Sequence, residues 1–440
     1  MSLPPSSSTP SALNIESTLQ AGKTAFLGMA TLSTAQKNEA LAQFAEIIAQ
    51  HADLLLAENQ KDIAQAEADA LTPSLYQRLK LDAGKIAQLV QGIRDLIQLP
   101  DPAGQVLGRT QLDDGLILEK ITVPLGLIGI IFESRPDVIP QILSLILKSG
   151  NAVVLKGGRE ATQTNQAFMQ LVDKLNAACP WLPPHWATLL DGREAVQQML
   201  HYPQFVDLII PRGSNQLVQS IMSNTKIPVL GHADGVCHLY VHPSVKLDQA
   251  VAVAVDAKIQ YPSACNALET LLVDKAIASS FLPRFAQEAQ AAGITLRGCK
   301  DTLLLLPQID PASDADWRTE YGDLTLSIKV VPSLDAAIQH INQYGSHHTD
   351  AILAQDPAVL EHFLNAVDSA CVFANASTRF ADGFRFGLGA EIGISTAKTH
   401  ARGPVGLEGL VIYKYKLRGQ GHIVADYVGT TAKPFQHQAL

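Results

Sequence analysis

The spacing of apolar residues changes along this 440-residue chain. From about Ser33 to Ala70, apolar positions recur every three or four residues with Ala, Glu, Gln and Lys between them, which predicts one or two amphipathic helices. A second helical stretch covers about Leu75 to Leu99 and ends at "LPDPAG", because proline and glycine interrupt helices. We therefore expect a helical N-terminal region.

After residue 123, short apolar runs alternate with helical segments. The runs "PLGLIGIIF", "NAVVLKG", "WATLL" and "FVDLIIP" form a first set, and "VCHLYVH", "ALETLLV", "LTLSIKVV", "HTDAILAQ" and "SACVFAN" form a second. Such alternation is typical of βαβ units, whose strands form parallel sheets. The pattern predicts an α/β protein with two domains of this kind.

Two stretches near residues 108–123 and 409–421 have the alternation of exposed strands, whose unpaired edges favour pairing with another subunit. We therefore expect a homo-oligomer. The longest apolar run, residues 123–132, is too short to cross a bilayer, so no membrane span is predicted. The Ser- and Pro-rich residues 1–14 lack the segments of a secretion signal and predict a disordered leader on a cytoplasmic protein.

Charge and cysteine usage narrow the possible partners. The net charge is −9 and no Lys/Arg cluster occurs, which argues against nucleic acid and favours small molecules. Adjacent residues of a strand point to opposite faces, so His347 and His348 are not expected to share a metal ion. The cysteines form no CxxC pair and no zinc spacing, so neither disulfides nor a structural metal are predicted; they are Cys179, Cys237, Cys265, Cys299 and Cys371.

One cysteine stands in an unusual context. In "QYPSACNALET", Cys265 lies between a Pro-Ser turn and Asn266, directly before a strongly apolar run. A free cysteine is most often a small core residue, and that interpretation suits the other four. For Cys265 the residues alone leave both a nucleophile and a core residue open.

Three further stretches offer binding chemistry. In "FVDLIIPRGSNQ", Gly213 and Ser214 lie between a strand and a helix, where N–H groups can bind a pyrophosphate, although an ordinary strand-to-helix connection has the same pattern. Lys156 ends an apolar strand before two glycines, which suits either a ligand crevice or a solvated turn. His348 could line a substrate mouth or be an ordinary histidine.

The glycine-rich C-terminal stretch "FANASTRFADGFRFGLGAEIGISTAKTHARGPVG" contains several cations. Arg379, Lys398 and Arg402 are candidates for binding a small anion such as phosphate, and a solvated connection is the alternative.

Together, these stretches resemble the aldehyde dehydrogenase superfamily and, within it, the reductases that act on L-glutamyl 5-phosphate. The resemblance covers nearly everything after about residue 15 and is carried by "VPLGLIGIIFESRPDV", "SGNAVVLKGGREA", "PRGSNQLVQSI", "PVLGHADGVCHLYV", "YPSACNALETLLV", "YGSHHTDAI" and "FGLGAEIGISTAKTHARGPVGLEGL".

The resemblance implies a doubly wound cofactor domain, a smaller α/β catalytic domain and a β-hairpin oligomerisation element. We assign residues 15–108 and 124–235, with part of 379–404, to an NADP-binding domain. The catalytic domain is expected at 236–378. Residues 109–123 and 405–440 are expected to supply the oligomerisation strands and tail.

The resemblance also implies roles for individual residues. Cys265 matches the nucleophilic thiol, Lys156 the lysine that holds the adenosine ribose, and Glu320 the glutamate that holds the nicotinamide ribose. Gly213 and Ser214 match the pyrophosphate turn. Arg159 stands where members that prefer NAD carry a glutamate, and its guanidinium can pair with a 2′-phosphate, so we expect NADPH.

Two departures from the superfamily pattern indicate the reaction. "GHADGVCH" lacks the glutamate that activates water in aldehyde oxidation, and "FESRPDV" lacks the usual oxyanion asparagine, leaving Asn266 or backbone N–H groups for that role.

We therefore expect NADPH-dependent reduction of L-glutamyl 5-phosphate to glutamate 5-semialdehyde and phosphate through a Cys265 thioester, in proline biosynthesis. Channelling from glutamate 5-kinase is a partner hypothesis that follows. The alternatives are an NAD(P)-dependent dehydrogenase that oxidises a small aldehyde, and a non-catalytic nucleotide-binding protein of this fold.

Overall fold

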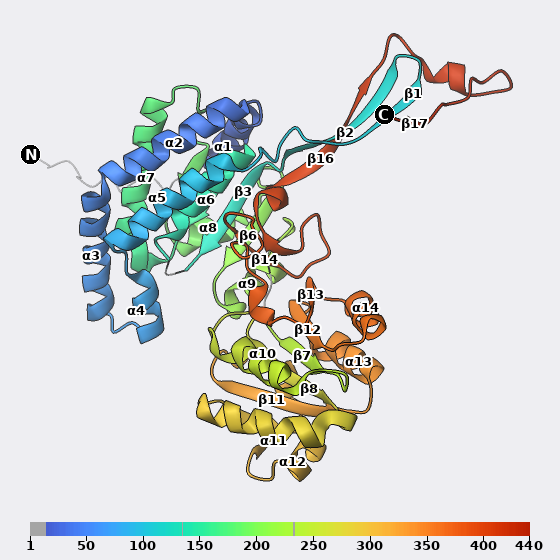
Figure 1. Ribbon diagram of the computed structural model, residues 1–440. Coiled ribbons are helices and arrows are strands. Elements are labelled where there is room, and N and C mark those ends of the chain that lie inside the picture. Colours follow the sequence, from blue (N-terminus) through green and yellow to red (C-terminus); the bar gives the residue numbers. More distant parts are fainter. Residues whose placement is uncertain (1–14, 134, 232–233) are drawn as a thin grey trace, which may run out of the picture. The chain divides into compact units, whose positions relative to one another are not determined.

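The computed structural model describes residues 15–133, 135–231 and 234–440, and the predicted leader 1–14 lies outside this range (Figure 1). The contacts divide the chain into two units. Unit 1 comprises the described residues of Met1–Gly213, Ser220–Val229 and Leu407–Leu440; unit 2 comprises those of Ser214–Gln219 and Leu230–Gly406.

Unit 1 begins with a layer of helices. They are α1 (Ile15–Met29), α2 (Thr34–Gln50), α3 (Ala52–Ala68), α4 (Pro73–Leu79) and α5 (Ala83–Gln98). The prediction for 33–70 is confirmed as two helices, whereas the stretch predicted at 75–99 is interrupted. Asp82 accepts a hydrogen bond from the Lys85 backbone N–H at 2.8 Å and starts α5 as a new helix. The sequence analysis missed α1, although Ile15, Leu19 and Met29 bury one face of it.

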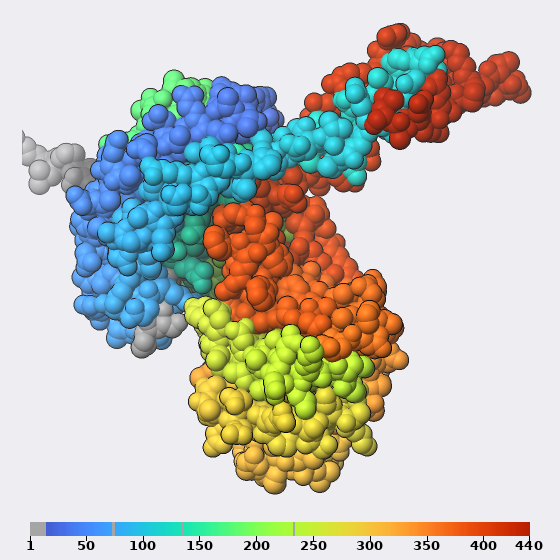
Figure 2. All heavy atoms as spheres, viewed as in Figure 1, coloured from blue at the N-terminus to red at the C-terminus, as the bar shows by residue number. Residues whose placement is uncertain are grey.

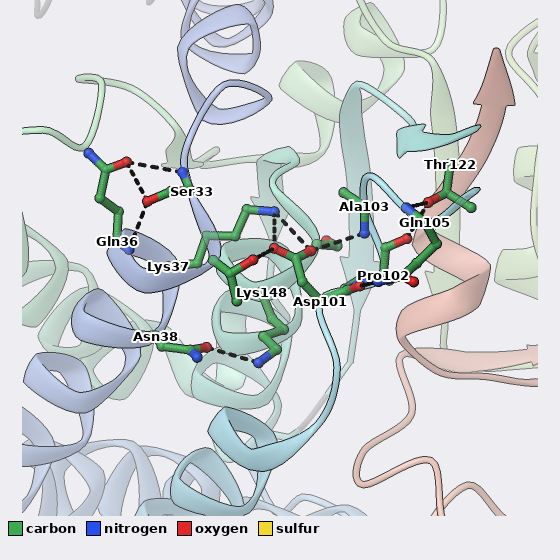
Figure 3. A network of polar contacts seen from close by, with 12 residues as sticks. Ser33, Gln36, Lys37, Asn38, Asp101, Pro102, Ala103, Gln105, Thr122 and Lys148 are labelled. Atoms are coloured by element: carbon green, nitrogen blue, oxygen red, sulfur yellow. Dashed lines mark hydrogen bonds and ion pairs between the residues drawn. The ribbon is translucent and has the colours of Figure 1, made fainter. Parts of the chain in front are cut away.

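A buried ion pair connects α2 of this helical layer to the segment that follows α5 (Figure 3). Lys37 Nζ lies 3.0 and 2.9 Å from the two carboxylate oxygens of Asp101. Asp101 also accepts hydrogen bonds from Thr34 Oγ1 at 2.9 Å and from the Ala103 backbone N–H at 3.0 Å. Both carboxylate oxygens are therefore satisfied, as buried charges require.

A four-stranded parallel sheet of order β5-β4-β3-β6 forms the centre of unit 1. Its strands and the associated helices are β3 (Leu127–Phe132), α6 (Val138–Ser149), β4 (Ala152–Lys156), α7 (Thr162–Ala178), β5 (Ala187–Leu189), α8 (Arg193–Met199) and β6 (Leu208–Arg212), and α9 (Asn215–Asn224) follows. Ile131 of β3 is paired with Lys156, and Phe132 with Arg212. Lys156 and Gly213 therefore lie at the carboxyl edge of this sheet.

An antiparallel sheet of order β16-β2-β1-β17 also belongs to unit 1. Its strands are β1 (Val106–Asp113), β2 (Leu116–Pro124), β16 (Val411–Arg418) and β17 (Gln438–Ala439). The predicted strands near 108–123 and 409–421 are thus confirmed, the first as a hairpin. Figure 2 shows this sheet at the surface in cyan and red, and Ile412, Tyr413, Tyr415 and Leu417 on its edge strand β16 are exposed.

Unit 2 is built on a seven-stranded parallel sheet of order β10-β9-β11-β8-β7-β12-β13. The strands are β7 (Cys237–Val241), β8 (Leu268–Asp274), β9 (Thr295–Gly298), β10 (Asp310–Pro311), β11 (Thr325–Val331), β12 (Thr349–Leu353) and β13 (Cys371–Ala374), and a small β14–β15 pair (Gly393–Ser395, Gly403–Val405) follows. The helices are α10 (Leu247–Ile259), α11 (Lys275–Ala291), α12 (Lys300–Leu305), α13 (Leu334–Tyr344) and α14 (Pro357–Ala366).

Both faces of this sheet are covered by apolar side chains. On one face Leu271 packs in a core with Phe281 of α11, and on the other Leu272 packs in a core with Phe363 of α14. Every residue of β8 is buried for this reason, which explains why the stretch after Cys265 is mostly apolar. The parallel sheets confirm the predicted α/β fold class.

None of the described helices is long and apolar enough to cross a membrane.

Candidate active site

Three parallel strands bring the candidate reactive residues together at one edge of the unit 2 sheet. Strand β7 lies between β8 and β12 and runs parallel to both. Cys237 is the first residue of β7, Cys265 lies shortly before β8, and His348 directly precedes β12. Because the amino ends of parallel strands meet at one edge, residues far apart in the sequence become neighbours here.

The Cys265 thiol contacts the His348 ring. Cys265 Sγ lies 3.2 Å from His348 Nε2, and His348 Nδ1 lies 2.8 Å from Thr349 Oγ1. When Nδ1 carries the ring proton and donates it to Thr349, Nε2 can accept the proton of the thiol. The geometry therefore suits a thiol activated by an imidazole. The sequence analysis considered His348 for the substrate mouth and did not connect it with Cys265.

The backbone of Cys265 is held by residues of the strand β7 segment. A Cβ atom at Gly235 would lie only 2.1 Å from the Cys265 carbonyl oxygen, so this close approach requires glycine. Cys237 Sγ donates a hydrogen bond to the same oxygen at 3.3 Å. Burial raises the pKa of Cys237 well above its ordinary value, which keeps this second thiol protonated. Sequence analysis did not single out Gly235 or Cys237 for this function.

Asn266 links the nucleophile segment to the loop that follows β13. Its side-chain Nδ2 donates to the Ala381 carbonyl at 2.7 Å, and the residue is buried. The Asn266 backbone N–H has no acceptor among the described residues. The side chain thus fixes the loop, while the backbone N–H next to Cys265 remains available to an oxyanion.

The three cations predicted for the substrate or phosphate have different surroundings. Lys398 Nζ and Arg402 Nη1 both pair with the Asp368 carboxylate, at 2.7 and 3.2 Å. Arg379, in the short 3₁₀ helix Thr378–Phe380, is 9% exposed and bonds through Nε to Gln260 Oε1 at 2.8 Å. Only Arg379 among them lacks a carboxylate partner within the described chain.

The residues predicted to bind the cofactor are divided between the two units. In unit 1, Lys156 is the half-buried last residue of β4, and Arg159 begins a 3₁₀ turn, Arg159–Ala161, with an exposed side chain. Gly213, also of unit 1, follows β6. Ser214 belongs to unit 2 and directly precedes α9, whose first N–H groups suit an anion. Within unit 1, the Lys156 and Arg159 side chains have the charge that a dinucleotide with an additional phosphate requires.

Glu320 of unit 2 is connected to the Cys265 backbone through Gly235. Its Oε2 accepts from the Gly235 backbone N–H at 2.9 Å and from Asn215 Nδ2 at 3.2 Å. Gly235 therefore contacts the carboxylate through its nitrogen and lies against the Cys265 backbone at its Cα. This contact places the predicted nicotinamide-ribose residue close to the predicted nucleophile.

A buried ion pair supports the loop that carries Glu320. Lys258 Nζ lies 2.7 Å from Glu269 Oε2, and both side chains are fully buried. The other carboxylate oxygen of Glu269 accepts a long hydrogen bond, 3.4 Å, from the Gly322 backbone N–H. Burial raises the pKa of Glu269 to about 7, although Lys258 opposes this shift. Sequence analysis missed this pair, because Lys258 and Glu269 lie in apolar segments with no motif.

Comparisons with known proteins agree on one family. The model of the aldehyde dehydrogenase family matches residues 7–297. The γ-glutamyl phosphate reductase of Synechococcus sp. strain JA-3-3Ab is 54% identical over 413 residues, which are 93% of this chain and 91% of that protein. γ-Glutamyl phosphate reductase 1 of Synechocystis sp. strain PCC 6803 is 53% identical over 94% of this chain and 96% of its own length.

A solved structure has the same fold. The crystal structure of γ-glutamyl phosphate reductase from Thermotoga maritima superposes with a TM-score of 0.91 at 37% identity, covering 93% of this chain and 99% of that one.

Proposed function

Because this chain belongs to the aldehyde dehydrogenase family and, within it, to the γ-glutamyl phosphate reductases, we propose that it reduces L-glutamyl 5-phosphate to L-glutamate 5-semialdehyde and phosphate. This reaction is the second step of proline biosynthesis from glutamate. The observation that carries the proposal is the 3.2 Å contact between Cys265 Sγ and His348 Nε2. It supplies a nucleophile and a base in a protein whose sequence lacks the water-activating glutamate of aldehyde oxidation.

The first half of the reaction forms a thioester. His348 Nε2 takes the thiol proton, and the Cys265 sulfur attacks the acyl carbon of the substrate. The carbonyl oxygen becomes negative, and we propose that the Asn266 backbone N–H stabilises it. The bond between the acyl carbon and the phosphate oxygen then breaks, and phosphate leaves with its electron pair.

The second half releases the aldehyde. When bound, NADPH supplies the hydride that reduces the thioester carbonyl carbon. The resulting Cys265 thiohemiacetal collapses, the carbon–sulfur bond breaks with its electrons on sulfur, and the aldehyde forms. His348 holds a proton at Nε2 that can return the thiol to its resting state. Lys156, Arg159, Gly213, Ser214 and Glu320 are the residues that we propose to hold the cofactor.

We propose NADPH over NADH because Arg159 is an exposed cation three residues after Lys156. A charge-assisted contact with a 2′-phosphate would favour NADPH by about one to two decades in catalytic efficiency. The Arg159→Glu variant should reverse this preference, measured as the ratio of kcat/KM values with the two cofactors. An unchanged ratio would remove Arg159 from the cofactor site.

The reaction is tested in the reverse direction. With glutamate 5-semialdehyde and NADP, reduction of the cofactor should require phosphate or arsenate, because an oxyanion must resolve the Cys265 thioester. Fast NADP reduction in phosphate-free buffer with glutamate as the product would instead support the alternative, aldehyde oxidation. Cofactor binding without turnover in either buffer would support a non-catalytic protein.

Three finer features belong to this proposal. Homo-oligomerisation is supported by the exposed apolar residues of edge strand β16, and sedimentation of the purified protein tests it.

Cytoplasmic location follows from the biosynthetic role, and fractionation of cells tests it. Direct transfer of the acyl phosphate from glutamate 5-kinase follows from the reactivity of that intermediate, and competition by an added trap tests it.

A further inference from the structure

We propose that Arg379 binds the phosphoryl group of the acyl phosphate beside Cys265, and inorganic phosphate in the reverse reaction, whereas Lys398 and Arg402 hold the C-terminal loop. This inference rests on the proposed function and assigns its leaving-group site.

Arg379 is a buried cation without an acid partner. Its side chain bonds through Nε to Gln260 Oε1 at 2.8 Å, and its guanidinium carbon lies 5.9 Å from the centre of the Tyr261 ring. Among the described residues no carboxylate pairs with it, and its terminal nitrogens have no acceptor. Burial lowers the pKa of Arg379 and the neighbouring Arg385 adds to this shift, while the carboxylates of Asp382 and Asp256, which form no ion pair with it, oppose the shift only in part. An anionic ligand would supply the remaining compensation.

Residues before and after Cys265 in the sequence contact Arg379 or the turn that carries it. Gln260 and Tyr261 belong to the segment that leads directly to Cys265. Asn266, on the other side of Cys265, bonds to Ala381, two residues after Arg379. A negative charge on Cys265 raises the pKa of Arg379, so the two groups interact electrostatically. The segments on both sides of Cys265 therefore contact Arg379 or the short turn that carries it.

The phosphoryl group is the better match of the two anionic groups on the substrate. It is bonded to the carbon that Cys265 attacks, whereas the α-carboxylate lies at the other end of the glutamyl chain. A guanidinium with both terminal nitrogens available presents a planar fork that fits two phosphate oxygens. Arg385 lies beside it, since Arg385 Nη1 donates to the Arg379 carbonyl at 2.5 Å. The second cation favours the more highly charged ligand.

The other two predicted cations, Lys398 and Arg402, already form ion pairs with a carboxylate. Asp368 pairs with Lys398 and Arg402, and Arg402 also donates to the Asp368 and Thr396 carbonyls. These bonds lower the pKa of Asp368 and join the loop before β15 to the loop before β13. The single carboxylate of Asp368 is shared by these two cations, and both side chains are more exposed to water than Arg379. Arg379, buried and without an ion pair among the described residues, is therefore the cation that most needs an anion.

Kinetics of the reverse reaction test the assignment, because phosphate and the semialdehyde have separate KM values. In Arg379→Gln the KM for phosphate should rise at least about tenfold, while the KM for the semialdehyde changes less than about twofold. Arg379→Lys should lie between the two, since it keeps the charge and loses the fork. Arg284→Gln, an arginine paired with Asp248 on the same unit, is the matched control and should leave both KM values unchanged.

Two kinetic outcomes would overturn the proposal. A rise in the semialdehyde KM alone would assign Arg379 to the α-carboxylate. A phosphate KM that responds to Arg402→Gln as strongly as to Arg379→Gln would place the phosphate site elsewhere.

A second measurement does not depend on turnover. Iodoacetate is an anion and iodoacetamide is neutral, so the ratio of their alkylation rates at Cys265 reports an adjacent cation. Arg379→Gln should lower this ratio several-fold, and phosphate should protect the wild type from iodoacetate. An unchanged ratio in Arg379→Gln would overturn the proposal. If instead the wild type lacks phosphate-dependent NADP reduction but shows the expected ratios, the proposed reaction fails and the anion site stands.

Discussion

In unit 1 the buried Asp101 carboxylate accepts hydrogen bonds from Lys37, Thr34 and Ala103, whereas in unit 2 the buried Arg379 guanidinium has no acid partner in the described chain. The two sites therefore differ in how completely the protein itself supplies partners for a buried charge. A charge whose partners are all internal contributes to folding and has little capacity left for a ligand. A buried charge that lacks a partner is costly in the empty protein and is suited to binding one from outside.

Two further groups of unit 2, the Glu269 carboxylate and the Cys265–His348 pair, also have properties that depend on how they are paired. Glu269 has Lys258 on one oxygen and only a long hydrogen bond on the other, and its pKa is raised to about 7. The Cys265 thiol meets an imidazole that can take its proton. Substitutions at the Lys37–Asp101 pair should therefore change stability, and those around Cys265 should change activity.

The largest effect is expected for Cys265→Ser. Serine is far less acidic than cysteine, so the rate of semialdehyde-dependent NADP reduction should fall by about 10⁴-fold or more, while the unfolding free energy changes by less than about 1 kcal/mol. Cys299→Ser, at a partly buried cysteine bonded to Thr302, is the control and should retain activity. Retention of a tenth of the activity by Cys265→Ser would contradict the covalent mechanism.

Asp101→Ala should be the most destabilising of these changes. It leaves the Lys37 ammonium buried without a partner, which should lower the unfolding free energy by about 3–5 kcal/mol in denaturant titrations. Activity per folded molecule should be unchanged. Arg94→Ala, which breaks an exposed ion pair with Glu46, should cost less than about 1 kcal/mol. Equal losses in the two variants would mean that burial does not determine the contribution of these pairs.

His348→Gln should reduce activity without a comparable loss of stability. Removing the base should lower kcat/KM by about a hundredfold and slow the alkylation of Cys265 by iodoacetamide, with the KM for NADPH unchanged. The neighbouring His347, which bonds to the Asp368 carbonyl, offers a matched control, and His347→Gln should alkylate at the wild-type rate. Identical alkylation rates for both variants would remove His348 from thiol activation.

The smallest effect is expected for Glu269→Gln and depends on pH. The pKa of Glu269 is raised in the folded protein, to about 7 from its ordinary 4.5, so its stabilising contribution is complete below pH 4.5 and is lost as the pH rises through 7. The wild type should therefore lose about 2 kcal/mol more unfolding free energy than Glu269→Gln between pH 5 and 8. Glu288→Gln, on the exposed face of α11, should keep the wild-type pH dependence. Parallel pH profiles of wild type and Glu269→Gln would contradict the raised pKa.

Local patterns in the sequence determined most of the fold. The three- and four-residue spacing predicted α2 and α3, because burial of one helix face imposes that period. The apolar runs predicted every strand of the unit 1 parallel sheet and five of the seven strands of the unit 2 sheet. They missed the short strands β9 and β10 at its edge. The run after Cys265 was apolar because β8 is covered on both faces. The helix α1 carried the same kind of spacing and could have been predicted, whereas the break between α4 and α5 depended on one capping side chain.

The sequence by itself also predicted Cys265 as the nucleophile, through the family resemblance, and a set of cations and glycines as candidates for binding a small anionic ligand. It could not determine which of these groups meet. Cys265 and His348 are 83 residues apart and become neighbours because β8, β7 and β12 lie side by side with their amino ends at one edge.

Tertiary structure alone likewise separated Arg379 from Lys398 and Arg402 and raised the pKa of Glu269. The pKa of a charged side chain, and its availability to a ligand, depend on its burial and its ion-pair partners. Both are set by segments that come together only when the chain folds.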